Sequence, residues 1–258
     1  MTYRCIEIEK AGATRILSLS RPEKKNAISF AMLHELDDAF RGIATDKSCN
    51  TVIIKGNGGL FSAGGDLKDI ADIDESDAPI TGIAVQEVFA KISILPQVVI
   101  ACLDGLVAGG GAELALYCDI RIASSGFRLS LPEIKHGLIP GAGGIGMMSR
   151  FIGINNTLYY LASGREMNAD TAFRLGLVQE VCSVDELYDT CLSLANSINI
   201  LQPEVVATAK RLAWMNLSRP IDECLIAESR EFGSLLNRFG KKQIQDFFSN
   251  KKKSNDNI

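Results

Sequence analysis

Apolar and polar residues follow a β-strand pattern at the start of the chain and a helical pattern after residue 26. Two β-rich runs, residues 4–9 and 14–20, are separated by a turn around Gly12, which favours a hairpin. From Ser29 onward, apolar residues recur every three or four positions, and Ser29 itself is a suitable helix cap. Residues 51–55 then form an apolar run typical of a buried strand. The pattern therefore predicts the order strand, strand, helix, strand.

The same alternation of strands and helices continues through the middle of the chain. Further strands are predicted at residues 96–103, 119–123, 128–131 and 177–182, and helices at residues 112–117, 203–215 and 221–236. The chain is mostly helical from Gly141 onward, and no low-complexity linker or fixed-period repeat divides it. We therefore expect one α/β core followed by a helical C-terminal region.

Composition and charge narrow the class of protein. The 258 residues are 47% apolar and 22% charged, which is typical of a well-buried globular protein. The 27 basic residues against 31 acidic ones give a net charge of −4, which argues against nucleic-acid or membrane-surface partners. Uncharged stretches reach only about 14 residues, short of the roughly 20 that a membrane helix needs. Seven scattered cysteines without C-x-x-C spacing indicate reduced thiols and a cytoplasmic protein.

Several common kinds of active site are excluded by the residue types available. The two histidines, His34 and His136, and the absence of a G-x-S-x-G motif leave little for a hydrolase triad. No metal-ligand spacing and no phosphate-binding Walker loop is present. Residues 141–146 match the dinucleotide pattern G-x-G-x-x-G, but Pro132 and Pro140 interrupt the strand that such a site requires. This motif favours a tight loop followed by a helix.

Two glycine-rich turns are better candidates for a site. Residues 60–67 follow a predicted buried strand and place small residues before a helix that starts at an acid. Residues 104–113 do the same at a second helix start, through three consecutive glycines. Backbone amides near Gly65 and Gly110 could therefore converge on one oxygen atom, although each cluster taken singly also fits an ordinary turn.

Two glutamates stand close to these turns in the sequence. Glu113 lies three residues beyond Gly110 within a run of Leu, Ala and Tyr, where an ionisable group is rare without a partner or a task. Its side chain shares a helix face with Gly110. Glu133 follows Pro132 before the glycine-rich loop, where it also fits a simple Pro-Glu helix start. Two carboxylates and two amide donors together would make a catalytic site.

Five segments in this order and spacing resemble the enoyl-CoA hydratase/isomerase (crotonase) superfamily. They are residues 21–28, 61–67, 104–114, 132–144 and 172–178. The resemblance implies an α/β fold built as a spiral of repeating ββα units, with a C-terminal helical region. Residues 1–200 would form the core with the CoA-thioester site, and residues 201–258 a trimerisation region of the same domain. A homotrimer or a dimer of trimers is implied.

The resemblance also assigns roles to individual residues. Such enzymes bind an acyl-CoA thioester and stabilise its enolate, and the matching oxyanion-hole amides are those of Gly65 and Gly110. Ala63 would offer its backbone to the adenine, and Lys68 would meet CoA phosphates. Substrate or CoA contacts are implied for Ala63, Asp66, Leu67, Lys68, Lys25 and Gly141, with Lys24 and a C-terminal Lys251 or Lys252 as further phosphate contacts. No metal and no cofactor are expected, because CoA is part of the substrate.

Family members that hydrate a double bond hold one water on two glutamates, and both matching positions here are Glu. We expect Glu113 to activate the water and Glu133 to protonate the α-carbon. Like charge and an apolar pocket should keep one of the two carboxyl groups protonated near neutral pH. The resemblance thus favours a 2-enoyl-CoA hydratase, or a dehydratase running the reverse reaction.

Three alternatives compete with hydration. A double-bond isomerase of the same superfamily needs only one working glutamate, and a nicotinamide oxidoreductase would use residues 141–146. The third alternative is a non-catalytic binding module.

Two segments, residues 145–148 and 237–243, depart from the family's usual sequence. The first affects the expected pocket lining and the second the expected subunit contacts, and neither includes any of the four catalytic positions.

Overall fold

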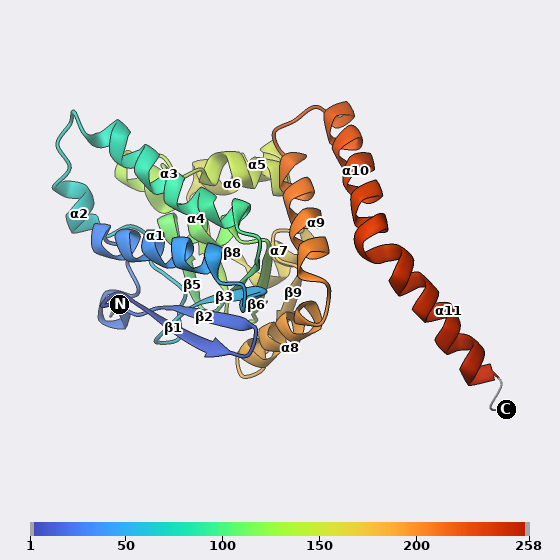
Figure 1. The fold of residues 1–258 in the computed structure, drawn as a ribbon. Coiled ribbons are helices and arrows are strands. Elements are labelled where there is room, and N and C mark those ends of the chain that lie inside the picture. The colour runs from blue at the N-terminus through green and yellow to red at the C-terminus, as the bar shows by residue number, and fades with distance from the viewer. Residues whose placement is uncertain (1–2, 256–258) are drawn as a thin grey trace. The chain divides into compact units, whose positions relative to one another are not determined.

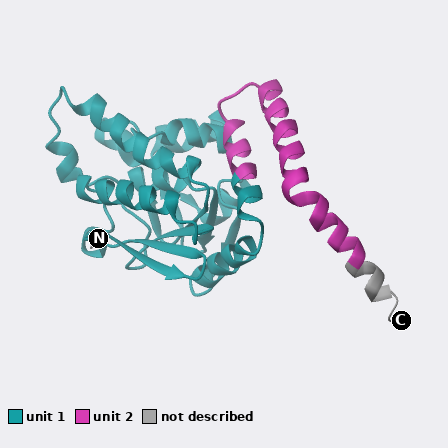
Figure 2. Ribbon diagram, in the orientation of Figure 1, with its two compact units in different colours: residues 1–207 teal, residues 208–258 magenta. Residues whose placement is uncertain are grey.

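The computed structural model describes residues 3–255, with side chains up to residue 249 (Figure 1). It divides into two compact units, Met1–Ala207 and Thr208–Ile258 (Figure 2). The boundary falls within helix α9 (Pro203–Met215), whereas the expectation from sequence places the division before this helix, at residue 200. The candidate site residues with described side chains all belong to the first unit.

A six-stranded sheet forms the centre of the first unit. The expected hairpin is present as β1 (Ile6–Ala11) and β2 (Thr14–Leu19), which pair antiparallel. The remaining strands join in parallel, so the order is β1-β2-β3-β4-β6-β9. Their bounds are β3 (Thr51–Gly56), β4 (Val98–Leu103), β6 (Ile120–Ser124) and β9 (Glu180–Cys182).

A second, three-stranded sheet shows how the chain spirals. It consists of β5 (Leu106–Ala108), β7 (Arg128–Ser130) and β8 (Met167–Asn168). After β4 joins the large sheet, β5 joins the small one, and β6 and β7 repeat this step one layer further along. The ββα spiral expected from the resemblance is therefore confirmed.

The inner strands of the large sheet, β2, β3, β4 and β6, are buried on both faces. Strand side chains on one face pack against Leu187, Cys191 and Ala195 of α8 (Leu187–Asn199). Helix α1 (Phe30–Thr45) lies on the opposite side of the sheet and starts at Ser29, whose side chain accepts a hydrogen bond from the Met32 amide, as expected (Figure 1). Because both faces are covered there, β3 and β4 read as largely continuous apolar runs, whereas the edge strand β1 alternates apolar and charged residues.

The first unit contains further helices. They are α2 (Leu67–Ala71), α3 (Ala78–Ile94), α4 (Gly109–Tyr117), α5 (Gly144–Ile152), α6 (Ile154–Ser163), α7 (Ala169–Arg174) and the 3₁₀ turns η1 (Pro22–Lys24) and η2 (Pro132–His136). The sequence predicts that the three glycines at residues 109–111 precede helix α4, but in the structure they form its first turn. Helix α3 is absent from the sequence-based prediction.

The second unit is helical, as the amphipathic patterns predict. It contains the end of α9, then α10 (Ile221–Leu235), a π-helical turn η3 (Leu236–Gly240) and α11 (Lys241–Asn255). Arg211 of α9 and Glu231 of α10 form an ion pair at 2.6 Å within this unit. Among the described residues, none of the helices is both long and apolar enough to cross a membrane.

Candidate active site

The two glycine turns meet because a short β-bridge joins them. The Ser62 amide donates to the Leu106 carbonyl at 3.1 Å, and the Ala108 amide donates to the Ser62 carbonyl at 2.9 Å. As a result, Gly65 and Gly110 lie side by side, and a Cβ added to Gly110 would stand 3.5 Å from the Gly65 nitrogen. Gly110 is in the first turn of α4, where an amide has no partner within the helix. The two glycines whose amides the sequence singles out are therefore neighbours in the structure.

Glycine is required where the two turns touch. Gly64 has φ +106°, and an added Cβ would lie 3.0 Å from the Ala108 carbonyl oxygen. Gly109 has φ +48°, and its Cβ would lie 3.0 Å from Oε1 of Glu133. Both conformations are ones that other residues rarely adopt. The close approach of the turns therefore depends on residues without side chains.

The segment that precedes α1 braces the first turn. Asn26 is fully buried and donates to the carbonyls of Asn57 at 2.8 Å and Leu60 at 3.1 Å. The Ser62 hydroxyl donates back to the Asn26 carbonyl at 2.8 Å. These bonds fix the loop that leads to Gly65.

Glu113 is 3% exposed and points its carboxylate at the loop before α5. Its Oε1 accepts hydrogen bonds from the amides of Ala142 at 2.7 Å and Gly144 at 2.9 Å. Burial nevertheless raises the pKa of Glu113 to about 7, with a smaller contribution from the charge of Glu133, because desolvation outweighs the two amide bonds. The group is therefore able to exchange a proton near neutral pH.

Glu133 lies on η2, directly after Pro132. Its Oε2 is buried and has no hydrogen-bond partner among the described residues, so this atom is available to a ligand. Burial raises the pKa of Glu133, opposed in part by a backbone hydrogen bond and, to a smaller extent, by the electrostatic influence of His136. The two carboxyl groups are thus both held toward the protonated form.

One cavity of about 470 Å³ joins these groups. Gly65, Gly110, Glu113 and Glu133 all line it, so the structure brings the four predicted residues together. The remaining wall is largely apolar and comes from α1, α2, α3 and the loop before α5. Its apolar side chains include Ile28, Leu33, Ile70, Ile73, Val85, Phe89, Leu138 and Ile139. A polar reaction centre inside an apolar cavity is typical of a small-molecule site.

The other predicted contact residues divide into two groups. Ala63, Asp66, Leu67 and Gly141 line the cavity. Asp66 also caps α2 at the Lys68 amide and forms an ion pair with Arg21 at 3.0 Å, which together hold its pKa below the usual range.

Lys25 and Lys68 do not line the cavity. Lys68 lies on the neighbouring helix α2, and the Lys25 carbonyl accepts a hydrogen bond from the Ala63 amide at 2.9 Å. Lys251 and Lys252 lie in α11, where side chains are outside the described part of the structure. Contact between these lysines and CoA stays a prediction.

Three residues around the cavity are missing from the sequence-based prediction of the site. His136 lines the cavity, Gln86 of α3 donates to the Gly141 carbonyl at 2.7 Å, and the Tyr117 hydroxyl lies against Gly143. Gln86 is a polar residue within an apolar segment, which is a weak signal, but its partner is 55 residues away. His136 is recognisable only by its place three residues after Glu133.

The loop at residues 141–144 is not a dinucleotide-binding turn. The 3₁₀ turn η2, rather than a strand, precedes it, and α5 starts at Gly144. The amide of Gly144, which could otherwise bind a phosphate, is already bonded to Glu113. The predicted tight loop followed by a helix is confirmed.

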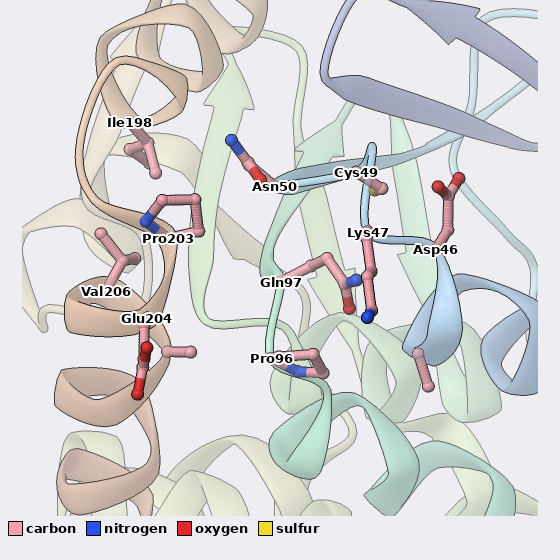
Figure 3. A pocket seen from close by; sticks show the side chains of 12 residues that line it. Asp46, Lys47, Cys49, Asn50, Pro96, Gln97, Ile198, Pro203, Glu204 and Val206 are labelled. Carbon is pink, nitrogen blue, oxygen red and sulfur yellow. The ribbon is translucent and has the colours of Figure 1, made fainter.

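A second cavity of about 480 Å³ lies between the starts of β3 and β4 and the start of α9 (Figure 3). Two of its polar side chains are engaged in structural bonds: Asp46 pairs with Arg15 at 2.5 Å, and the Gln97 amide donates to the Ile43 carbonyl at 2.8 Å. Across residues 3–255, no three His, Cys, Asp or Glu side chains are grouped to hold a metal ion. The cavity that contains both predicted glutamates and both predicted glycines is therefore the candidate active site.

Comparison with known proteins agrees with this geometry. A sequence model described as enoyl-CoA hydratase/isomerase matches residues 9–256. The chain is 33% identical to a short-chain-enoyl-CoA hydratase of Clostridium acetobutylicum, over 98% of this chain and 97% of that protein. It is 32% identical to a crotonyl-CoA hydratase of Syntrophomonas wolfei, over 99% and 98% of the two chains.

Solved structures give the same answer for the fold. The crystal structure of an enoyl-CoA hydratase from Bacillus anthracis superposes with a TM-score of 0.91 at 29% identity, covering 96% of this chain and 97% of that one. The residues matched by the family model, 9–256, include both glycine turns and both glutamates. The chain therefore belongs to the enoyl-CoA hydratase/isomerase family.

Proposed function

We propose that this protein is an enoyl-CoA hydratase that adds water across the 2,3 double bond of a 2-enoyl-CoA thioester, or removes it in the reverse direction. The observation that carries the proposal is the convergence of two amide donors and two raised-pKa carboxyl groups on one cavity. The relatives named as hydratases support the same reaction.

The thioester carbonyl binds between the amides of Gly65 and Gly110. Negative charge develops on this oxygen as water attacks the β-carbon, and an oxyanion donor of this kind contributes about 10²- to 10³-fold in rate. Gly110 contributes further because it opens helix α4, whose positive dipole end faces the same point. The enolate is thereby the species that the site favours.

The two glutamates divide the proton transfers. Ionised Glu113 removes a proton from the water, whose oxygen bonds to the β-carbon, and protonated Glu133 gives its proton to the α-carbon. The product gains one H and one OH, and the proton on Glu113 passes back to Glu133 to restore the starting state. The backbone amides stabilise the enolate and the two glutamates carry the protons, so we expect no cofactor or metal beyond the CoA within the substrate.

The substrate's nucleotide end extends past Ala63 toward Lys68 and Lys25, with a C-terminal lysine completing the phosphate contacts. A short acyl chain is supported by the relatives named for short-chain and crotonyl substrates. We place the enzyme in the cytoplasm, in keeping with seven free cysteines, and as a homotrimer or dimer of trimers without nucleic-acid or membrane partners.

The proposal is tested by measuring hydration of crotonyl-CoA. The reaction is monitored through the loss of absorbance of the enoyl thioester. Glu113→Gln and Glu133→Gln each remove one proton carrier at nearly constant shape, so turnover should fall by about 10²- to 10⁴-fold. Binding of a saturated acyl-CoA should change little. Undiminished hydration in both variants would refute the assignment, and conversion of a 3-enoyl-CoA to its 2-enoyl isomer without hydration would favour the isomerase.

A further inference from the structure

The turn that holds Glu113 is itself held from outside the active site. The Gly141 carbonyl and the Ala142 amide belong to one planar peptide unit, in which the two groups point in opposite directions. On one side, the Gln86 side-chain amide donates to the Gly141 carbonyl at 2.7 Å. On the other side, the Ala142 amide donates to Oε1 of Glu113 at 2.7 Å. A single rigid group therefore connects Gln86 to the carboxylate.

One face of α3 makes this contact. Gly82 and Gln86 are four residues apart, and Phe89 follows three residues later, so the three share a helix face. A Cβ on Gly82 would lie 3.9 Å from the Gly141 oxygen, and the Phe89 ring packs against Tyr117 at 6.3 Å between centroids. The same face also forms part of the cavity wall through Val85 and Phe89.

Tyr117 supports the turn from beneath. It lies one helical turn after Glu113 on α4, and a Cβ on Gly143 would be 2.6 Å from its hydroxyl oxygen. Gly143 has φ +104°, which lets the backbone pass over the ring. The loop is thus confined between α3 and α4, with its amides directed at the carboxylate.

We propose that Gln86 is a positioning residue for Glu113, acting through the Gly141–Ala142 peptide. This role rests on the proposed function, in which Glu113 is the base. Hydrogen bonding at the carbonyl end polarises the peptide and strengthens the donor at the amide end. Without the hydrogen bond from Gln86 to the Gly141 carbonyl, the Ala142 amide becomes a weaker donor to Glu113. The ionised form of Glu113 is then less favoured.

The sign of the effect follows from the groups around Glu113. Its ionised form is favoured by the Ala142 and Gly144 amides and opposed by burial and by the charge of Glu133. The titratable or charged residues that line the same cavity or contact its loop are Glu133, His136, Tyr117, Asp66 and Asp69. None of them is altered when Gln86 is replaced, so a weaker Ala142 bond raises the pKa of Glu113.

The test compares Gln86→Leu with Glu87→Leu, which introduces the same residue at the next position of α3, where the side chain is also exposed. In the free protein, the Glu113 carboxyl titration is followed by ¹³C NMR and assigned by its absence in E113Q. We expect Q86L to raise the midpoint by about half a pH unit, from the strength of one hydrogen bond, and Glu87→Leu to leave it unchanged. An unshifted midpoint in Q86L would overturn the proposal.

Activity and rescue provide independent readings. Below the midpoint, kcat/KM of Q86L for crotonyl-CoA should fall about threefold and recover at higher pH. Gln86→Lys restores a donor, so its midpoint should return to the wild-type value or lower, whereas a midpoint that stays with Q86L would assign the effect to packing and overturn the proposal. Absence of hydration in the wild type would refute the proposed function, while the NMR result would still decide the role of Gln86.

Discussion

At the residue scale, Glu113 links the chemistry of the site to the stability of the fold. Its pKa rises from an ordinary 4.5 to about 7 on folding, mainly through burial. Below pH 4.5 the group is protonated in both states. Between pH 4.5 and 7 the unfolded chain has released this proton and the folded chain has not, so the free energy of unfolding falls as the pH rises.

The expected loss across this interval is about 3 kcal/mol, at about 1.4 kcal/mol per pH unit. Glu113→Gln keeps an oxygen that accepts both amides but cannot ionise, so its stability should depend less on pH. Urea unfolding of both proteins between pH 5 and pH 8 measures the difference. If the free energy of unfolding depended on pH equally in the two proteins, the raised pKa of Glu113 would be contradicted.

Single residues were predictable where they break a local pattern. Glu113 stands out as a charge in an apolar helix, and Gly65 and Gly110 stand out as small residues before helix starts; the structure brings all three to one cavity. Gln86 and Tyr117 could not be found in this way, because their importance lies in contacts with a loop that is distant in sequence. The type of a residue indicates which chemistry it can perform, whereas the residues that hold a catalytic group in place are revealed only by tertiary contacts.

At the element scale, the first turn of α4 is the point where backbone conformation and catalytic geometry depend on each other. We expect Gly109→Ala to lower both stability and activity. Its φ of +48° disfavours a side chain by about 1–2 kcal/mol. The new methyl would lie 3.0 Å from Oε1 of Glu133 and 3.5 Å from Cα of Gly64, displacing both. A displacement of this kind lowers kcat by roughly 10²-fold.

Gly12→Ala is the matched control for this substitution. Gly12 has φ +61° in the β1–β2 turn, and no atom lies within 4 Å of its added Cβ. It should lose similar stability and retain full activity. Steady-state kinetics and urea unfolding of the two variants separate the backbone penalty from the effect on the site. Equal activity in both would show that the contact with Glu133 is unimportant.

Elements were predictable where apolar residues repeat with a clear period. Helix α1 has a buried face and a serine cap, and it starts where the sequence predicts. Helix α3 was missed because Pro79 and Gly82 interrupt it and because Ile80, Ile83 and Ile94 are exposed while Val88 and Phe89 are buried. Strands β5 and β8 contain only three and two residues, too few to show alternation.

At the scale of the whole molecule, the spiral is what turns separate sequence signals into one site. Successive turns of the chain stack along both sheets, so Ser62, which follows β3, pairs through an isolated bridge with Val107 of β5 in the next turn. Periodicity does not reveal this pairing, since it shows which residues are buried and not which strands are neighbours. The sequence therefore predicted that the Gly65 and Gly110 amides share one site, but the strand pairing that brings them together is seen only in the structure.

The second unit raises a separate question about assembly, because its helices carry many large apolar residues. Leu225, Ile226 and Phe232 lie on α10, and Ile244, Phe247 and Phe248 lie on α11. A helical region of this composition favours burial against other copies of the chain. We expect sedimentation to give about three or six times the 27.9 kDa of one chain. Replacing Leu225 and Phe232 with Glu should lower that mass, and a 27.9 kDa species in the unmodified protein at micromolar concentration would contradict the proposed trimer.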